Sequence, residues 1–324
     1  MGWIGRIRLQ ALLEADIGTV VAVADPDPSA AAAGAAAADG SLAVADLDEL
    51  LRLDLDGVVI ATPSALHAEQ SLAALDHGLA VFCQKPMARS ATEAEAVLAT
   101  ARRAGRPFGV DLSYRRTAAA QRMQQELRQG RIGRVFAAQL TFHNAYGPDK
   151  QWFLDRHRSG GGCLIDLGTH LLDLLLWLLG DERLRVEAAT LLQAGAKLAN
   201  GSNAVEDFVA AQLTTASGAA VQLACSWFLP AGLDCLFECT LFGTEGSLAL
   251  TNVDGSFHDF RLEWRHGTSA QLLVSPPDDW GGRTLCDWAL RLQRGEGFDP
   301  ELAAELHAIP KVIDAIYRYG GVQR

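Results

Sequence analysis

Apolar runs and helical patterns alternate along the first third of the chain. A continuous apolar run rich in β-branched residues is typical of a strand buried on both faces. Four such runs occur, at residues 20–24, 55–61, 79–83 and 108–112. Helical patterns lie between them, at residues 29–38, 67–77 and 91–104. This alternation predicts an α/β domain over residues 1–118, in which helices cover both faces of a parallel sheet.

The pattern changes beyond residue 118. A helical pattern at residues 119–129 precedes six strand-like runs, several of them joined by short glycine-containing turns, at residues 134–143, 207–215, 219–227, 235–242, 247–252 and 257–264. Further helices are expected at residues 164–179, 284–293 and 300–319. Consecutive strands without intervening helices favour an antiparallel sheet. We therefore predict an α+β domain over residues 119–324, with a large, mainly antiparallel open sheet and C-terminal helices.

Composition narrows the function classes. The 324 residues carry a formal net charge of −11, and an acidic surface repels phosphate backbones, so no nucleic-acid partner is expected. The most apolar stretch, residues 171–179, is short and interrupted by Asp173, so no membrane-spanning helix is expected. Arg6 and Arg8 stand where a signal peptide needs an apolar core. We therefore expect a cytoplasmic protein whose six cysteines are reduced.

The first residues match part of a dinucleotide-binding motif. Gly2-Trp3-Ile4-Gly5 corresponds to the second half of G-x-G-x-x-G, whose glycines let backbone amides approach a pyrophosphate at a helix N-terminus. Asp25 lies 20 residues after Gly5 and follows an apolar run, where an acidic residue binds ribose hydroxyls. We predict that Gly2, Trp3, Ile4, Gly5 and Asp25 bind NAD in a Rossmann-type domain. NADP is disfavoured, because the Asp25 carboxylate would repel its 2′-phosphate; alternatively, Asp25 only opens a turn.

The first glycine of this motif and the strand that should precede it are absent, because the sequence opens at Met1. Unpaired backbone groups inside a sheet are costly. We therefore expect the strands at residues 20–24 and 55–61 to lack a ladder partner on one side each. We also expect the chain as given to bind NAD weakly, or to be unstable, unless something else fills the gap.

Four further segments occur in a characteristic order: residues 61–67 (ATPSALH), 84–86 (QKP), 160–173 (GGGCLIDLGTHLLD) and 243–247 (GTEGS). In this order and at these separations they resemble the Gfo/Idh/MocA family, the glucose–fructose oxidoreductase and inositol dehydrogenase-like enzymes. The run at residues 160–173 is the most specific part of the resemblance, which covers the chain apart from the missing strand. It implies a nicotinamide-dependent enzyme acting on sugars or cyclitols.

The resemblance also implies roles for single residues. Thr62, Pro63, His67, Gln84 and Lys85 would line the cofactor, although His67 could equally be a helix residue without such a role. The peptide after Lys85 would be cis and would aim the lysine inward. Gln84 stands where the family usually has Glu, so a charge beside Lys85 is lost while hydrogen bonding is kept.

Three residues are predicted to be catalytic: Lys85, Asp166 and His170. His170 would be the general base in oxidation, because histidine titrates near neutral pH. Lys85 would hydrogen-bond the reacting oxygen, and Asp166 would orient the histidine or bind a substrate hydroxyl. Tyr114 and Arg115 match a family segment that often shapes the pocket.

Asp166, His170 and Asp173 are four and three positions apart, which places them on one face of an otherwise apolar helix. Buried charges are costly unless paired or functional. The glycines at residues 160–162 would let a ligand approach the backbone closely, and Asp173 is expected to act behind the other two. The alternative is that Asp166 is an ordinary first-turn residue and His170 a core histidine.

These observations predict an NAD-dependent oxidoreductase that transfers a hydride between the cofactor and a secondary alcohol or ketone of a sugar, sugar derivative or cyclitol. A redox-assisted glycoside hydrolase or lyase and a non-catalytic NAD(P)-binding regulator remain as alternatives. No metal is expected, since no metal-binding motif occurs. A homodimer or homotetramer is expected, because the apolar runs at residues 209–213 and 221–225 would leave one sheet face in need of a cover.

Overall fold

The computed structural model describes residues 1–180, 183–278 and 281–322, and the chain forms two compact units. The first unit comprises Met1–Ala88, Thr92–Ser113 and Gly281–Ala303, and the second comprises Arg89–Ala91, Tyr114–Trp280 and Ala304–Arg324. The units therefore differ from the two expected domains, since a late segment of the chain returns to the first unit.

Helix α9 is the main part of that late segment. This helix (Arg283–Gln293) packs on helix α1 (Trp3–Ala15) and on two strands of the parallel sheet. Cβ atoms at Gly57 and Gly109 would lie 2.9 Å and 3.0 Å from ring atoms of Trp288 on α9, so the two strand glycines make room for this indole. Burial of this indole against the sheet explains why α9 belongs to the first unit.

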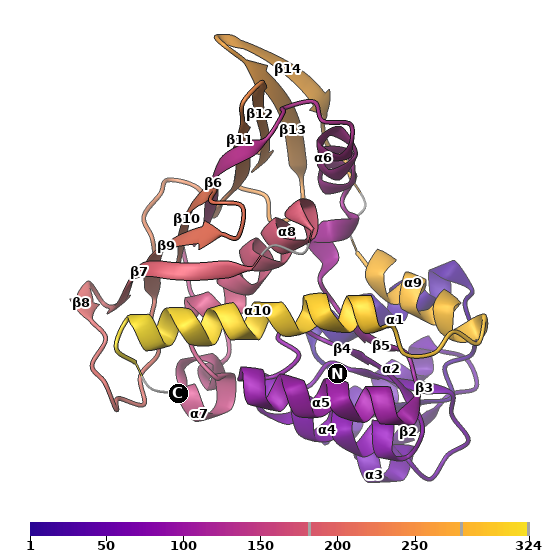
Figure 1. Cartoon of the computed structure of the whole chain (residues 1–324). Coiled ribbons are helices and arrows are strands. Elements are labelled where there is room, and N and C mark those ends of the chain that lie inside the picture. The colour runs from indigo at the N-terminus through magenta and orange to yellow at the C-terminus, as the bar shows by residue number, and fades with distance from the viewer. Residues whose placement is uncertain (181–182, 279–280, 323–324) are drawn as a thin grey trace. The chain divides into compact units, whose positions relative to one another are not determined.

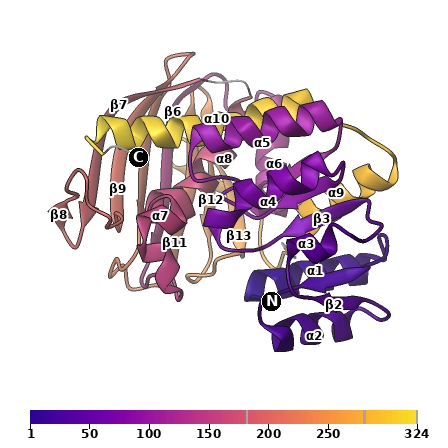
Figure 2. The same cartoon turned by 90° about the horizontal axis from the view of Figure 1, so that it is seen from below.

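Strands and helices alternate in the first unit (Figure 2). After α1 its elements are β1 (Ala22–Ala24), α2 (Pro28–Ala37), β2 (Leu42–Val44), α3 (Leu47–Leu50), β3 (Gly57–Ile60), α4 (Ser64–Asp76), β4 (Ala80–Cys83), α5 (Ala91–Ala104) and β5 (Phe108–Val110). The predicted strands and helices are present. The sequence pattern does not predict the short strand β2, because its three residues are largely exposed and show no apolar pattern.

The parallel sheet of the first unit is in two parts. β1 pairs with β2, while β3 pairs with β4 and β4 with β5, all in parallel. Over residues 1–180, all of which are described, no ladder joins β1 to β3. This confirms the expectation that the runs at residues 20–24 and 55–61 each lack a partner on one side.

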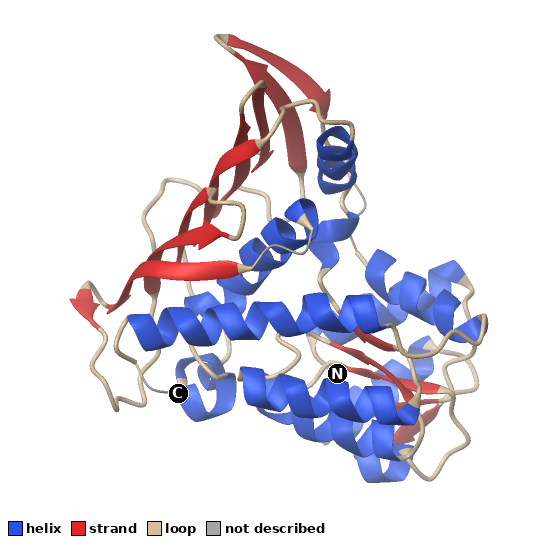
Figure 3. Ribbon diagram, viewed as in Figure 1, coloured by secondary structure: helices blue, strands red, loops and turns tan. Residues whose placement is uncertain are grey.

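One large sheet dominates the second unit (Figures 1 and 3). Its strands are β6 (Val135–Asn144), β7 (Leu184–Gln193), β8 (Ala196–Lys197), β9 (Phe208–Thr215), β10 (Ala220–Ser226), β11 (Cys235–Gly243), β12 (Gly246–Asn252), β13 (Phe260–His266) and β14 (Ser269–Val274). Its helical segments are η1 (Ser113–Arg116), α6 (Ala118–Arg128), η2 (Gln151–Leu154), α7 (Arg156–Ser159), η3 (Leu164–Gly168), α8 (Thr169–Leu179) and the later part of α10 (Pro300–Tyr319).

The strand order of this sheet is β14-β13-β12-β11-β6-β10-β9-β7-β8. Neighbouring strands are antiparallel except β6 and β10, which are parallel, so the predicted large and mainly antiparallel sheet is confirmed. The sequence pattern does not predict β7, β8 and β14. β8 and β14 are the two edge strands and β7 lies between β8 and β9; exposed side chains in all three obscure the apolar alternation.

The two faces of this sheet differ in polarity. Val209 and Cys225 lie side by side on β9 and β10, fully buried, on the face against which η3 packs. On the other face, Gln212, Gln222 and Gln139 follow one another in register across β9, β10 and β6. The apolar residues of β9 and β10 are therefore covered within the chain. They do not form the open apolar face from which self-association was predicted.

One helical stretch in the described part of the chain, Arg156–Leu179, is long and apolar enough to cross a membrane by length and composition alone. Its mean hydropathy reaches 1.6, and 78% of that window is buried inside the protein. The buried central helix of a globular unit shows this pattern as well. Figure 1 shows α8, the last part of this stretch, beside the large sheet.

Candidate active site

The N-terminus of α1 has the features of an anion site. The helix begins at Trp3, with Gly2 as an extended N-cap that has no side chain to cap its first amides. Such amides carry the positive end of the helix dipole and bind phosphate groups. A Cβ atom at Gly5 would lie 3.0 Å from Met1 Cγ, so glycine here makes room for the Met1 side chain. The residues present fit a pyrophosphate.

Asp25 lies directly after β1, at the position expected for a ribose-binding carboxylate. Its Oδ1 accepts the amide N–H of Asp27 at 2.9 Å, and its Oδ2 is ion-paired with the ammonium group of Met1. A carboxylate offers about four lone-pair positions. Both oxygens therefore keep the capacity to accept ribose hydroxyls, and the role of Asp25 stays a prediction that its place in the fold supports.

His67 connects the loops that follow β3 and β4. Its buried ring has Nε2 2.7 Å from the Thr62 carbonyl oxygen and Nδ1 2.7 Å from the Pro86 carbonyl oxygen. Burial lowers the pKa of His67, the carbonyl contacts raise it in part, and the charge of Lys85 lowers it further. Both ring nitrogens thus lie within hydrogen-bonding distance of a main-chain carbonyl oxygen. The Lys85–Pro86 peptide is cis, as the resemblance implied.

The side chain of Gln84 belongs to a buried polar group. It donates to the Asp111 carboxylate, and Arg8 Nε on α1 donates to the same carboxylate at 2.5 Å. Ser113 Oγ accepts from Arg8 at 3.1 Å and donates to Asp111 at 2.7 Å. Sequence reasoning missed Arg8 and Asp111. The available signal was a carboxylate inside the apolar run FGVDL, which demands a partner when it is buried.

In the second unit, Asp166 and His170 lie on either side of a change in helix type. Leu164–Gly168 (η3) is a π-helical turn, and the α-helix α8 begins at Thr169, whose amide donates to the Leu164 carbonyl five residues back. π turns are rare and are frequent at functional sites. The prediction of a regular helix over residues 164–179 is therefore wrong at its first turn.

Both side chains are partly exposed and contact aromatic residues. The ring centroid of His170 lies 4.6 Å from that of Tyr114 and 6.1 Å from that of Phe142. Trp227 Nε1 donates to Asp166 Oδ2 at 3.2 Å. The aromatic rings restrict the imidazole, and the indole holds the carboxylate. The second unit thus presents an oriented imidazole and an oriented carboxylate, which are suited to proton transfer.

The glycines before this helix pack against the chain itself. A Cβ atom at Gly161 would overlap Tyr317 Oη, and one at Gly162 would overlap the carbonyl oxygen of Glu206. Glu206 Oε1 accepts the N–H groups of Gly162 at 2.9 Å and Leu164 at 3.1 Å, and the O–H of Tyr317 at 2.6 Å. Burial raises the pKa of Glu206. The glycines therefore make room for Glu206 and Tyr317, which corrects the prediction that they admit a ligand.

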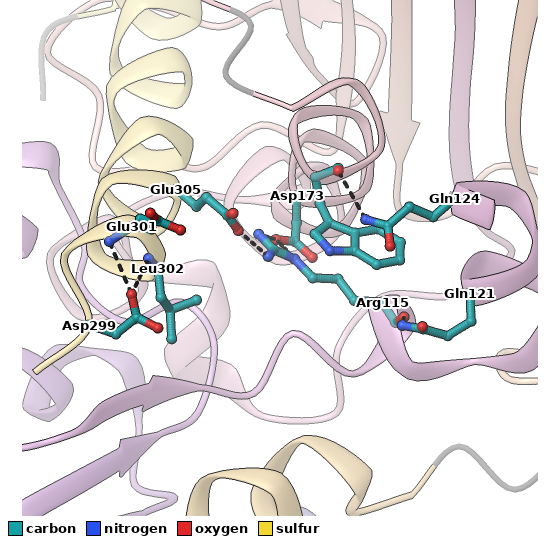
Figure 4. A network of polar contacts seen from close by, with 9 residues as sticks. Arg115, Gln121, Gln124, Asp173, Asp299, Glu301, Leu302 and Glu305 are labelled. Carbon is teal, nitrogen blue, oxygen red and sulfur yellow. Dashed lines mark hydrogen bonds and ion pairs between the residues drawn. The ribbon is translucent and has the colours of Figure 1, made fainter. Parts of the chain in front are cut away.

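Asp173 belongs to a separate network in the second unit (Figure 4). Arg115 Nε donates to Asp173 Oδ1 at 2.7 Å, and Arg115 NH1 donates to Glu305 Oε2 at 2.5 Å. The Asp173 side chain is 1% exposed, whereas that of Glu305 is 44% exposed. Of the three residues predicted on one helix face, the structure leaves Asp166 and His170 accessible and pairs Asp173 with Arg115.

No group of three or more His, Cys, Asp or Glu side chains in the described chain could hold a metal ion. All six cysteines are free, and five of them are buried. Burial raises the pKa of Cys83, Cys235 and Cys239 to about 12. These thiols are therefore neutral at physiological pH and behave as small apolar side chains.

Both units match known families. Residues 1–112 match an oxidoreductase family with an NAD-binding Rossmann fold, and residues 120–249 match the GFO/IDH/MocA C-terminal domain. The chain is 32% identical over 286 residues to the D-apiose dehydrogenase of Paraburkholderia graminis, covering 86% of this chain and 72% of that protein. It is 35% identical over 214 residues to the 1,5-anhydro-D-fructose reductase of Ensifer adhaerens, covering 65% of this chain and 62% of the reductase, slightly under two thirds of its length.

The fold also has solved counterparts. KijD10, a 3-ketoreductase from Actinomadura kijaniata solved with NADP, superposes with a TM-score of 0.85 at 22% identity, over 100% of this chain and 95% of that one. At this identity the likeness establishes the fold alone. The two family matches and the apiose dehydrogenase relative go further. The chain therefore belongs to the Gfo/Idh/MocA oxidoreductase family, whose N-terminal domain has an NAD-binding Rossmann fold.

Proposed function

We propose that the chain transfers a hydride between NAD and a secondary alcohol or ketone of a sugar, sugar derivative or cyclitol. The observation that carries this proposal is the arrangement of Asp166 and His170 across the π turn. The uncapped N-terminus of α1, which fits a pyrophosphate, supports the cofactor class. Relatives named for apiose and anhydrofructose support the substrate class.

In this proposal His170 accepts the proton of the substrate hydroxyl during oxidation and returns it during reduction, because imidazole titrates near neutral pH. Lys85 donates a hydrogen bond to the reacting oxygen and stabilises negative charge there. Asp166, held by the indole of Trp227, orients the imidazole or binds a neighbouring hydroxyl. The bound nicotinamide supplies the hydride acceptor or donor.

The cofactor residues keep their predicted roles as part of the proposal. The amides of Gly2, Trp3, Ile4 and Gly5 would bind the pyrophosphate at the start of α1. The loops that follow β3 and β4 would line the nicotinamide side. Their predicted contact residues are Thr62, Pro63, His67, Gln84 and Lys85.

We also propose that NAD is preferred to NADP, because Asp25 binds ribose hydroxyls and repels a 2′-phosphate. The change Asp25→Ala should weaken NADH binding about 10- to 100-fold, the usual worth of a charge-assisted hydrogen bond. NADPH binding should not weaken. Fluorescence titration with both reduced cofactors measures this, and Asp27→Ala, which removes the nearby cap of α2, is the matched control. Tighter binding of NADPH by the unaltered protein would contradict the preference.

A panel of sugars, sugar derivatives and cyclitols incubated with NAD tests the reaction class. Absorbance of NADH and chromatography of the sugar are followed together, with His170→Ala as the background. A dehydrogenase forms NADH and ketone in equal amounts. Sugar product without net NADH would instead support the redox-assisted hydrolase or lyase, and bound NAD without any product would support the regulator.

We further propose a cytoplasmic homodimer or homotetramer that binds neither nucleic acid nor membranes. Exposed apolar side chains in the large sheet support self-association: Phe136 on β6 is 48% exposed, Leu236 on β11 38% and Leu272 on β14 56%. Large apolar side chains left exposed on a monomer are candidates for burial in an interface, and closed symmetric dimers are the commonest oligomers. Sedimentation at micromolar concentration tests this, and a monomer mass would refute it.

A further inference from the structure

Asp111 is the centre of the buried polar group at the carboxyl end of the parallel sheet. It is 2% exposed. Its carboxylate accepts hydrogen bonds from Arg8 Nε at 2.5 Å, from Ser113 Oγ at 2.7 Å and from the side-chain amide of Gln84. Arg8 is itself 1% exposed. Charges removed from water this completely are costly unless each has partners of this kind. Removal of any one of these side chains would therefore leave a buried charge without one of its partners.

This group holds the backbone that leads into Lys85. The Asp111 amide donates to the Cys83 carbonyl at 2.9 Å, and the Gln84 amide donates to the Ile60 carbonyl at 2.9 Å. Main-chain and side-chain bonds thus both fix Gln84 against its neighbouring strands. Lys85 is the next residue, so its backbone begins from a fixed point.

A second buried side chain holds the chain on the other side of Lys85. His67 Nδ1 lies 2.7 Å from the carbonyl oxygen of Pro86, and its Nε2 lies 2.7 Å from that of Thr62. The residues immediately before and after Lys85 are therefore each anchored by a buried polar contact. The freedom left to Lys85 is largely that of its own side chain.

Arg8 links this anchor to α1. It lies three residues after Gly5, within the first turns of the helix whose N-terminus fits a pyrophosphate. Because no ladder joins β1 to β3 in residues 1–180, the sheet does not tie the Asp25 strand to the Lys85 strand directly. The ion pair between Arg8 and Asp111 instead connects α1 to the end of β5 through side chains.

The neutral amide at position 84 suits this arrangement. It donates to Asp111, while Arg8 supplies the balancing charge. A carboxylate at position 84 would place two anions beside one guanidinium, and their repulsion would raise the pKa of one of them. The negative charge of Asp111 therefore favours a neutral hydrogen-bond donor at position 84.

We propose that Asp111 is a positioning residue that, through Gln84 and Arg8, fixes the backbone of Lys85 and places the cofactor-binding turn of α1. The proposal rests on the proposed function through the role of Lys85. Its test uses Gln84→Glu, Asp111→Asn and the double variant that exchanges amide and carboxylate, with Gln125→Glu on the exposed side of α6 as the matched charge control.

Gln84→Glu should lower kcat at pH 8 by up to about 100-fold, the effect of a displacement near 1 Å, with little change in sugar KM. Relative to the unaltered protein at the same pH, its kcat should recover toward pH 5, because protonation of one carboxylate removes the second anion. Two neighbouring thiols do not titrate in this window, since burial raises the pKa of Cys83 to about 12 and also raises that of Cys286. The charged groups nearby are then Arg8, Asp111 and Lys85; His67, which contacts Pro86 and whose pKa burial lowers, is common to the variant and the unaltered protein, so the comparison between the two removes its contribution.

The double variant should recover most of the lost kcat and show no such pH dependence, because one carboxylate again faces one amide. Asp111→Asn should weaken NADH binding several-fold, measured by fluorescence titration. If Asp111→Asn fails to fold, Gln84→Glu still decides, because it keeps Arg8 and Asp111. A Gln84→Glu variant with the kcat and pH profile of Gln125→Glu, or a double variant no better than its worse parent, overturns the proposal.

Failure of the proposed function is distinguishable from failure of this inference. An unaltered protein that turns over no sugar would fail the function. NADH binding by Asp111→Asn would still report on the anchor in that case, and unchanged affinity would overturn the positioning role.

Discussion

The two units hold their polar residues in place by different means. In the first unit the strands β1 and β4 have only three and four residues, the sheet is split, and buried side chains make the long-range connections. In the second unit, strands such as β6 and β11, with ten and nine residues, form one continuous ladder. Where backbone pairing is incomplete, buried polar side chains take over the ordering of the site.

The same contrast extends to the residues nearest the predicted chemistry. Lys85 follows a strand end that Gln84 and Asp111 anchor by hydrogen bonds. His170 is restricted instead by the rings of Tyr114 and Phe142. Loss of one partner in the first unit leaves a buried charge unpaired, whereas loss of one ring in the second unit leaves a cavity. The two kinds of loss have different energies and different pH dependences.

The largest expected effect tests whether proton transfer belongs to the second unit. His170→Ala should lower kcat about 10²- to 10⁴-fold, the usual contribution of a positioned acid or base. NADH affinity should change little, because the cofactor turn lies in the first unit. Steady-state kinetics and titration measure the two quantities, and His77→Ala, an exposed histidine of the first unit, is the control. A variant that keeps most of its activity removes His170 from the mechanism.

A second prediction asks whether the second unit also depends on a buried ion pair. Asp173→Ala leaves the Arg115 guanidinium without its buried partner and should lower the free energy of unfolding by about 3–5 kcal/mol. Glu305→Gln removes the more exposed partner and should cost about 1 kcal/mol or less. Urea unfolding of both variants measures the difference. Equal costs would show that burial does not decide the strength of this network.

Glu206 should make the second unit lose stability as pH rises. Burial raises its pKa above the ordinary value of 4.5, so the folded state holds a proton that the unfolded state releases. The free energy of unfolding therefore falls as pH rises from 4.5 through the raised pKa, by up to about 1.4 kcal/mol per pH unit. Glu206→Gln keeps an acceptor for Gly162, Leu164 and Tyr317 and should remove this slope. An identical slope in the variant would contradict the assignment.

His67 should have the opposite and smaller effect in the first unit. Its pKa lies below the ordinary value of 6.5, so the unfolded state takes up a proton first as pH falls. The contribution of His67 to the free energy of unfolding should be fully present above pH 6.5. It should be lost as pH falls from 6.5 through the lowered pKa. His67→Gln, which can still donate a hydrogen bond, should flatten this decline in thermal melts between pH 7 and 5. A steeper decline in the variant would rule out His67 as its cause.

The sequence predicts the strongly patterned elements of both units and fails where tertiary contacts decide. Continuous apolar runs predict β3, β4 and β5, and turn glycines predict the meander from β11 to β13. The edge strands β8 and β14 are missed because solvent-facing residues leave no alternation. The π turn is missed because its sequence pattern is equally compatible with an α-helix, and the contacts at its start, such as that between Gly162 and Glu206, are far apart in the sequence.

The site divides in the same way. Residues that belong to a spaced motif, such as Asp166, His170 and Asp25, could be proposed from the sequence. Arg8 and Asp111 are 103 positions apart, so no local spacing links them, and only the fold reveals that they pair. The sequence shows the glycines at residues 160–162, but it does not show that they make room for Glu206 and Tyr317. A close approach by a ligand and a close approach by a buried side chain leave the same mark in a sequence.

The π turn has a consequence for the number of residues in this part of the chain. An α-helix advances about 100° per residue about its axis, and the π turn already holds one residue more than an α turn, so inserting one further residue into Leu164–Gly168 would rotate the preceding segment by about that angle relative to His170. Gly162 would then turn away from Glu206, and Asp166 from Trp227. The number of residues between Gly162 and His170 therefore fixes how the two are oriented relative to each other about the helix axis. An insertion here should therefore be tolerated far less than a substitution, whereas deletion of one residue would leave a regular α-helix.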